Sequence, residues 1–209
     1  MMRIDHLAAA PDRAGRYLVR FSDGSTMRLY RQTVEDFSLY AGLELDEKQL
    51  SDLRTAAGQM SAKMRAVRIV SASSVSKKDL QSRLVAKGED PVQAREAVKW
   101  MADLDLIDDR KTAQQVVERC IHKGYGIARA KQALYEKRIP KEYWEEVLAD
   151  YPQQTDKITE FLQSHLHTDA DPKEMKRVID ALIRRGHNYS TIRRVLDRLS
   201  FDTDEFPEA

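Results

Sequence analysis

The alternation of apolar and polar residues predicts a β-hairpin near the N-terminus. Apolar residues alternate with polar ones in two short runs, Tyr17, Val19 and Phe21, and then Met27 and Leu29. Asp23-Gly24 lies between the runs, and an Asp-Gly pair in this position is typical of a tight hairpin turn because both residue types tolerate positive φ. Since a lone hairpin is marginal in water, we expect it to pack against neighbouring helices.

Helices are expected in the remainder of the chain. The T-x-x-D pattern from Thr33 to Asp36 is typical of a helix start, and a second helix should begin near Asp46. From about Met60 onward the apolar residues recur at the helical period of about 3.6 residues, and we find no strand pattern. Asp90-Pro91 and Asp171-Pro172 each place a capping carboxylate before a proline at the first helical position.

Three of the helical stretches, residues 79–89, 130–139 and 176–187, resemble one another. Each contains a leucine, a basic residue three positions later and then a helix-ending position: Leu84, Lys87 and Gly88; Leu134, Lys137 and Arg138; Leu182, Arg185 and Gly186. The leucines lie 50 and 48 residues apart. This spacing suits a three-helix unit repeated three times, with one helix before and one after each stretch. The helix after the first stretch has an apolar stripe of Ala94, Val98, Met101 and Leu104.

These patterns predict a mostly α fold. We expect three tandem three-helix-bundle repeats in an elongated curved array, preceded by a small N-terminal β-hairpin plus helix unit. The expected boundaries are 1–58 for the N-terminal unit, 59–105, 106–151 and 152–201 for the repeats, and 202–209 for an acidic tail. Stacked repeats share stability between neighbours and present a long surface, which suits an elongated partner.

The composition narrows the function classes. Of the 209 residues 33% are charged, yet the formal net charge is +1, which predicts no global attraction to nucleic acid or to an anionic membrane. Cys120 is the single cysteine, so no intrachain disulfide can form. No stretch approaches the roughly 20 apolar residues that span a bilayer, and the N-terminus lacks the apolar core of a signal peptide. We expect a cytoplasmic monomer that binds no membrane.

Basic residues are concentrated in the second and third repeats. Residues 111–141 contain eight basic and two acidic side chains, and the third repeat contains another basic cluster. Such runs either line one groove or ridge that binds phosphates or an acidic protein surface, or are solvated helix faces. Our candidate contacts are Arg129, Lys131, Lys137 and Arg138 in the second repeat and Arg184, Arg185, Arg193 and Arg194 in the third. Tyr189 either stacks on a partner or belongs to the core stripe with Ile192, and we favour the core.

No catalytic constellation is evident from the sequence. Cys120 lies on the apolar stripe of its helix, which favours a buried structural thiol over a nucleophile. His165 and His167 are two positions apart on an expected helix, so their rings point to different faces and do not share a metal ion. We therefore expect no enzyme activity, metal or cofactor, unless residues distant in the sequence assemble a site.

Several motifs resemble those of a known family. Ile107-Asp108-Asp109, followed by Ala113, Val116, Arg119 and residues 134–137, is similar to the central signature of the RecX family. Residues 184–196 are similar to its C-terminal signature and residues 76–88 to its first repeat, so that the resemblance covers about Met60 to Leu199. The chain departs from the family in three places. It has Leu104-Asp105-Leu106 where a glycine is usual, Thr112 where tyrosine is usual, and Arg138 in place of a common glycine.

The resemblance implies a modulator that lodges along the RecA filament and inhibits strand exchange, ATP hydrolysis and coprotease activity. It also implies three tandem three-helix repeats and assigns no catalytic residue. The basic faces would then contact acidic RecA surfaces, or filament DNA and RecA together. The alternative is a helical module that binds single- or double-stranded DNA directly, without RecA. A hydrolase, as a third class, would lose turnover when Cys120 or a histidine is altered.

Overall fold

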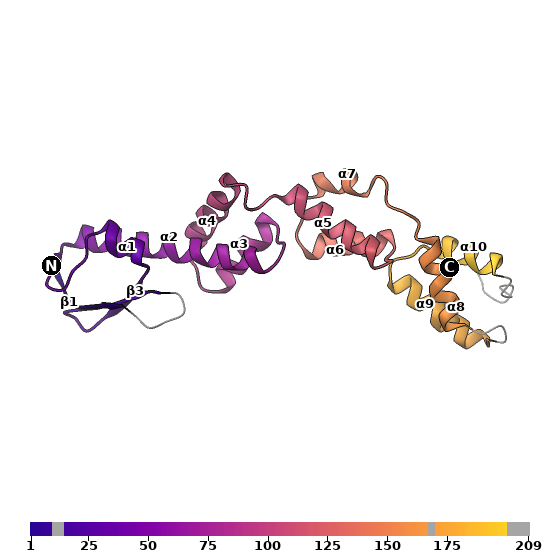
Figure 1. Cartoon of the computed structure of the whole chain (residues 1–209), viewed down its shortest axis with the longest axis horizontal. Helices are drawn as coiled ribbons and strands as arrows, with labels where there is room; N and C mark the ends of the chain where they lie inside the picture. Colours follow the sequence, from indigo (N-terminus) through magenta and orange to yellow (C-terminus); the bar gives the residue numbers. More distant parts are fainter. Residues whose placement is uncertain (10–14, 167–169, 200–209) are drawn as a thin grey trace. The chain divides into compact units, whose positions relative to one another are not determined.

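The computed structural model describes residues 1–9, 15–166 and 170–199. The chain divides into two compact units, Met1–Ile107 and Asp108–Ala209 (Figure 1). The predicted acidic tail at 202–209 and His167 lie outside the described residues. In the described ranges, no helix combines the length and the apolar character needed to cross a bilayer.

The first unit begins with a four-stranded sheet. Its strands are β1 (Met2–Ala9), β2 (Tyr17–Phe21), β3 (Thr26–Leu29) and β4 (Glu44–Leu45), in the order β3-β2-β1-β4, and all neighbours are antiparallel. The predicted hairpin is confirmed as β2 and β3, whereas β1 and β4 were not predicted. The hairpin loop is Ser22-Asp23-Gly24, in which Gly24 N donates to Phe21 O over 2.9 Å. Gly24 has a φ of 81°, so only the glycine of the Asp-Gly pair takes the left-handed conformation.

A long helix joins this sheet to the first bundle. Helix α2 (Glu47–Ala72) is capped by Asp46, which accepts from Gln49 N, and this confirms the predicted start. Leu50 and Leu53 of α2 belong to the core of the sheet. Ala62 and Ala66 belong instead to the core that α2 forms with α3 (Lys77–Ala86) and α4 (Pro91–Asp103). Figure 1 shows α2 running from the strands to α3 and α4. The helix continues through residues 58 and 59, where we expected the N-terminal unit to end. The expected domain boundaries stay predictions.

The second unit contains two helical bundles with separate cores. The second bundle comprises α5 (Asp109–His122), α6 (Ile127–Glu136), a 3₁₀ turn at Lys141–Tyr143 and α7 (Trp144–Leu148). The third comprises α8 (Thr155–His165), α9 (Pro172–Arg184) and α10 (Tyr189–Arg198). The mostly α fold with a small N-terminal β unit is thus confirmed.

The three similar stretches end their helices in the same way. Leu84, Leu134 and Leu182 are all buried, and each carbonyl accepts a hydrogen bond from the amide five residues later, on Glu89, Ile139 and His187. This is the pattern of a Schellman motif, which needs a left-handed residue after the helix. Gly88, Arg138 and Gly186 have positive φ at that position. The sequence repeat therefore corresponds to a repeated helix end.

Two details of the helix predictions are wrong. Helix α1 (Arg31–Asp36) begins two residues before Thr33, and Thr33 is 2% exposed and packs inward. Leu104 lies just after α4, where it is 51% exposed and leaves the apolar stripe. Asp105, which follows it, has a φ of 54° and so takes the conformation of the glycine that the RecX pattern has here.

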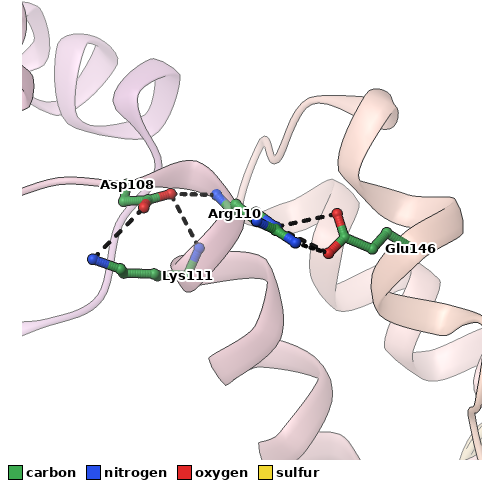
Figure 2. A network of polar contacts seen from close by, with 4 residues as sticks. All are labelled: Asp108, Arg110, Lys111 and Glu146. Atoms are coloured by element: carbon green, nitrogen blue, oxygen red, sulfur yellow. Dashed lines mark hydrogen bonds and ion pairs between the residues drawn. The ribbon is translucent and has the colours of Figure 1, made fainter.

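The Asp-Asp element begins the second unit by capping α5. Asp108 Oδ1 accepts from Arg110 N over 2.8 Å and from Lys111 N over 3.2 Å. The Arg110 guanidinium then reaches α7, where its Nε donates to Glu146 Oε1 over 2.9 Å. Figure 2 shows this network, in which Asp108 caps the start of α5 and Arg110 links α5 to Glu146 of α7. The network gives the Asp-Asp motif a structural role.

Candidate binding site: a cationic groove between the second and third bundles

Helices α6 and α9 meet end to end in the second unit. Gly126 N donates to Arg185 O over 2.9 Å, and Ala128 N donates to Gly186 O over 3.3 Å. The first amides and the last carbonyls of a helix have no partner within the helix, so here two helix ends satisfy each other. A Cβ at Gly126 would overlap the carbonyl oxygen of Gly186. The close approach therefore requires glycine.

Further hydrogen bonds fix this junction. Tyr151 Oη donates to Tyr125 O over 2.7 Å, and Gln154 Nε2 donates to Ile121 O over 2.9 Å. Burial raises the pKa of Tyr151 to about 12, which keeps its hydroxyl protonated as a donor. His187 is 6% exposed and lies against the Gly124 backbone, and burial lowers its pKa. The second and third bundles are therefore joined by backbone and buried side-chain contacts.

A cavity with a volume of about 560 Å³ opens at this junction. It is lined by Tyr125, Arg129, Phe161, His165, Arg177, Val178, Ala181, Arg184 and Arg185. Four of these side chains are arginines, and no carboxylate is among these lining residues. Neither Arg177 nor Arg184 has a hydrogen bond or ion pair with any other residue that the structure describes. A cluster of arginines in which two have no counter-ion favours an anionic ligand.

Aromatic rings form one side of this cavity. The Arg185 guanidinium carbon lies 4.5 Å from the centre of the Phe161 ring, within the range of a cation–π contact. Phe161 and His165 are stacked, with ring centres 4.1 Å apart and planes at 20°. His165 Nδ1 is 2.9 Å from Phe161 O, which holds the imidazole in place. His165 is exposed and lines the cavity, so the stack forms an accessible part of the cavity wall.

Two smaller cavities adjoin the first and share residues with it. One of about 170 Å³ shares Tyr125 and Arg129 with it and adds Arg119, Lys123 and Lys137. The other, of about 210 Å³, shares Phe161 and Arg185 and adds Lys157. We call the three together the cationic groove. Its basic residues are Arg119, Lys123, Arg129, Lys137, Lys157, Arg177, Arg184 and Arg185.

The acidic residues that line the groove are already paired. Glu136 Oε1 lies 3.1 Å from Arg129 Nη1, and the Arg129 and Gln132 hydrogen bonds lower the pKa of Glu136. Glu160 Oε2 lies 2.8 Å from Lys157 Nζ, which lowers the pKa of Glu160 in the same way. Both carboxylates therefore stay ionised at neutral pH, and each offsets the charge of one basic neighbour.

The groove contains four of the nine predicted contact residues: Arg129, Lys137, Arg184 and Arg185. The other five, all described, line none of these three cavities: Lys131, Arg138, Tyr189, Arg193 and Arg194. Arg194 Nη1 lies 3.4 Å from Gln153 Oε1. Tyr189 is half-buried and packs against the core of the third bundle. The tyrosine thus occupies the core position that we favoured.

The sequence interpretation missed Arg177, Phe161 and His165 as site residues. Arg177 and Arg184 are seven positions apart, which is two helical turns on one face of α9, so their spacing could have identified the pair. Phe161 follows the apolar stripe of its helix, and only the structure shows that it also stacks on His165. No sequence signal places α8 beside the end of α9.

Cys120, the candidate nucleophile, has a structural role. Cys120 is 6% exposed, and burial raises the pKa of its thiol despite the nearby Arg129, Lys123 and Arg119. A protonated, buried thiol is a poor nucleophile. Among the described residues, no group of three or more His, Cys, Asp or Glu side chains is placed to hold a metal ion.

The known proteins to which the chain is similar are RecX proteins. Residues 108–148 match the family model described as RecX, second three-helix domain, which corresponds to the second bundle. The chain is 25% identical over 211 residues to Regulatory protein RecX of Clostridioides difficile strain 630, covering 96% of each chain. It is 23% identical over 193 residues to Regulatory protein RecX of Streptococcus gordonii, covering 90% of this chain and 75% of the relative.

Solved structures share the fold. A crystal structure of a regulatory protein RecX superposes with a TM-score of 0.64 at 20% identity, over 94% of this chain and 100% of the other. RecX from Lactobacillus salivarius gives a TM-score of 0.58 at 20% identity, over 70% of this chain and 99% of the other. Together these likenesses lead to one conclusion: the chain is similar in sequence and fold to RecX regulatory proteins, and its second bundle matches their second three-helix domain.

Proposed function

We propose that this protein binds the RecA filament and restrains its recombinase, ATPase and coprotease activities. Similarity to proteins named as regulatory proteins supports a binding function rather than catalysis. The observation that carries the proposal is the cationic groove, in which eight basic side chains line three cavities that share lining residues and both acidic lining residues are paired. A filament assembled on DNA offers phosphates and acidic protein surfaces to such a groove.

Electrostatics explain why an otherwise balanced chain can bind an anionic polymer. The formal net charge is +1, so the whole molecule gives little attraction. Like charges gathered along one hollow surface repel one another, and a bound anion relieves that repulsion. Local concentration of charge also steers the approach of a polyanion and makes binding depend on ionic strength. The groove therefore supplies the attraction that the net charge does not.

The direct test is the ATPase activity of RecA on single-stranded DNA, measured with and without this protein. We expect the rate to fall as the protein is added. R184E/R185E should abolish this inhibition because both side chains line the groove. R193E/R194E makes the same change of charge on α10, outside these cavities, and should keep most of the inhibition. Unaltered RecA activity with the wild-type protein, or equal effects of the two variants, would contradict the proposal.

A second candidate is direct binding of DNA without RecA, which the stacked Phe161 and His165 rings favour because nucleic-acid bases stack on such rings. The two candidates differ in the preferred ligand. A RecA regulator should bind a RecA-coated strand more tightly than the bare strand at the same salt concentration. Equal affinities would favour the DNA-binding module.

A further inference from the structure

We propose that residues 200–209, the acidic segment, bind in the cationic groove of their own chain and compete there with the ligand. The contact is autoinhibitory, because a groove that holds the acidic segment has a lower affinity for any other anion. This inference rests on the proposed function and deepens it, since it concerns the regulation of the same groove. The acidic segment itself lies outside the described residues.

The charges of the acidic segment and of the groove are complementary. Among the residues of the segment there is no lysine, arginine or histidine, and four carry carboxylates: Asp202, Asp204, Glu205 and Glu208. In the groove, Arg177 and Arg184 form no hydrogen bond or ion pair with any other residue that the structure describes. Arginine and carboxylate form paired, charge-assisted hydrogen bonds. The acidic segment therefore offers the counter-ions that these two arginines lack.

The acidic segment is long enough to reach the groove. It follows α10, which packs against α8, and α8 contributes Phe161 and His165 to the groove (Figure 1). Ten residues can span up to about 34 Å, whereas the 13 residues of α9 form a helix only about 20 Å long. Every part of the groove that α9 lines is therefore within the span of this segment.

Two phenylalanines accompany the carboxylates. Phe201 precedes the first carboxylate, and Phe206 stands between the third and the fourth. The wall of the groove contains the stacked rings of Phe161 and His165. Aromatic side chains pack on other rings and on guanidinium groups. A segment that is both acidic and aromatic thus matches both kinds of side chain in the groove.

Attachment to the chain makes a weak contact sufficient. A short tether holds its ligand at an effective concentration in the millimolar range. If the free segment bound with a dissociation constant of about 0.1 mM, an effective concentration of about 1 mM would fill the groove about ten times as often as leave it empty. The apparent affinity of the groove for another anion would fall by about the same factor.

The first experiment measures whether the acidic segment occupies the groove. A fluorescently labelled peptide of residues 200–209 would be titrated with the full chain and with its variant D202N/D204N/E205Q/E208Q, followed by fluorescence anisotropy. This neutralised variant no longer fills its own groove, so it should bind the peptide about ten-fold more tightly than the wild type. Equal affinities of the two proteins, or no binding to either, would overturn the inference.

The second experiment locates the contact. Added to the neutralised variant, R177Q/R184Q should weaken peptide binding by about ten-fold because two charge-assisted contacts are lost. R193Q/R194Q removes the same charge from α10, which is nearer to the acidic segment in sequence and lines none of these cavities, and should keep most of the affinity. An equal or greater loss in this second pair would show that the segment binds its nearest cations, and the inference would fall.

The peptide itself supplies two further controls. Replacing its four acidic residues by amides should abolish binding, and replacing both phenylalanines by alanine should weaken it by about five-fold. Full affinity of the amide peptide would contradict the proposed charge pairing. Sedimentation velocity distinguishes the chain's own segment from that of a second copy. Dimers of the wild type that disappear in the neutralised variant would overturn the contact within one chain.

The ATPase assay with RecA separates this inference from the proposed function. The neutralised variant should inhibit RecA at a lower protein concentration than the wild type. Equal inhibition by the two proteins would show that the acidic segment does not compete with RecA, so that the inference would fall and the proposed function would stand. If the peptide bound as expected but neither protein altered RecA activity, the proposed function would fall and the contact of segment and groove would stand.

Discussion

Arg138 has a φ of 54°, a conformation that side chains other than glycine rarely adopt. It ends α6 as Gly88 ends α3 and Gly186 ends α9, so it occupies a glycine position of the repeat. The fold tolerates an arginine here because Arg138 N and Ile139 N still donate to the last turn of α6, over 2.8 and 3.0 Å.

Replacing Arg138 by glycine should therefore stabilise the second unit. We expect a gain of about 1 kcal/mol, because the left-handed strain disappears and outweighs the extra freedom of glycine in the unfolded chain. Urea unfolding should show a higher midpoint with an unchanged slope. Arg138→Ala removes the guanidinium but keeps the strain and should bring no gain. A glycine variant no more stable than the alanine variant would refute this account.

His187 makes the stability of the second unit depend on pH. Burial lowers the pKa of His187 below the ordinary value of about 6.5, so the unfolded chain binds a proton that the folded chain does not. Stability is therefore full above about pH 6.5 and falls as the pH drops below that value. We expect the thermal midpoint of His187→Gln to vary less between pH 7 and pH 5 than that of the wild type, as judged by circular dichroism.

The matched control is His122→Gln, because His122 is exposed at the end of α5. This variant should keep the pH dependence of the wild type. If both variants flattened the profile equally, or if His187→Gln kept the full dependence, the buried imidazole would not be the cause.

Helix ends were well predicted from sequence where the signal is local. Asp46, Asp90 and Asp171 accept from amides of the first turn, as their positions before the helices indicated. Thr33 has an equally suggestive pattern, but it is buried and α1 starts at Arg31 with no side-chain cap. Thr33 packs inside the N-terminal unit and does not cap the helix, although its local pattern favours a cap. The sequence carries no direct sign of this burial.

The junction of α6 with α9 is the element on which the groove depends. Gly126→Ala should separate the two helix ends, because the added methyl would overlap Gly186 O. We expect a loss of about 2 kcal/mol in the stability of the second unit, a typical cost of overpacking, together with weaker binding to the RecA filament. Thermal unfolding and the ATPase assay would measure the two effects.

Gly58→Ala is the informative comparison for this variant. Gly58 lies inside α2, where the atoms nearest to an added Cβ belong to the flexible end of the Gln93 side chain. Alanine favours a helix interior by about 1 kcal/mol over glycine, so this variant should be at least as stable as the wild type. A destabilised Gly58→Ala beside a normal Gly126→Ala would reverse the expected roles of the two glycines.

At the scale of the whole molecule, the sequence predicted the repeated helices but only part of the sheet. The pattern of β2 and β3 alternates clearly, whereas β1 has Ile4 as its only fully buried residue and β4 has two residues. Pairing of β1 with β4 joins Met2 to Leu45, far apart in the chain, so no local pattern indicates it. The groove was predicted only in part for the same reason, because its arginines come from helices that meet only in the folded chain.

The continuity of α2 has a consequence for how this protein can vary. Residues near its start pack in the core of the sheet, and residues near its end pack in the core of the first bundle. Because α2 is one continuous helix, no loop lies between them to absorb a change of length. One inserted residue would turn one end against the other by about 100° and displace it by about 1.5 Å. The apolar side chains of α2 could then no longer pack into both the sheet core and the core of the first bundle. The length of the middle of α2 is therefore fixed by the two cores, and we expect insertions to be tolerated in surface turns instead.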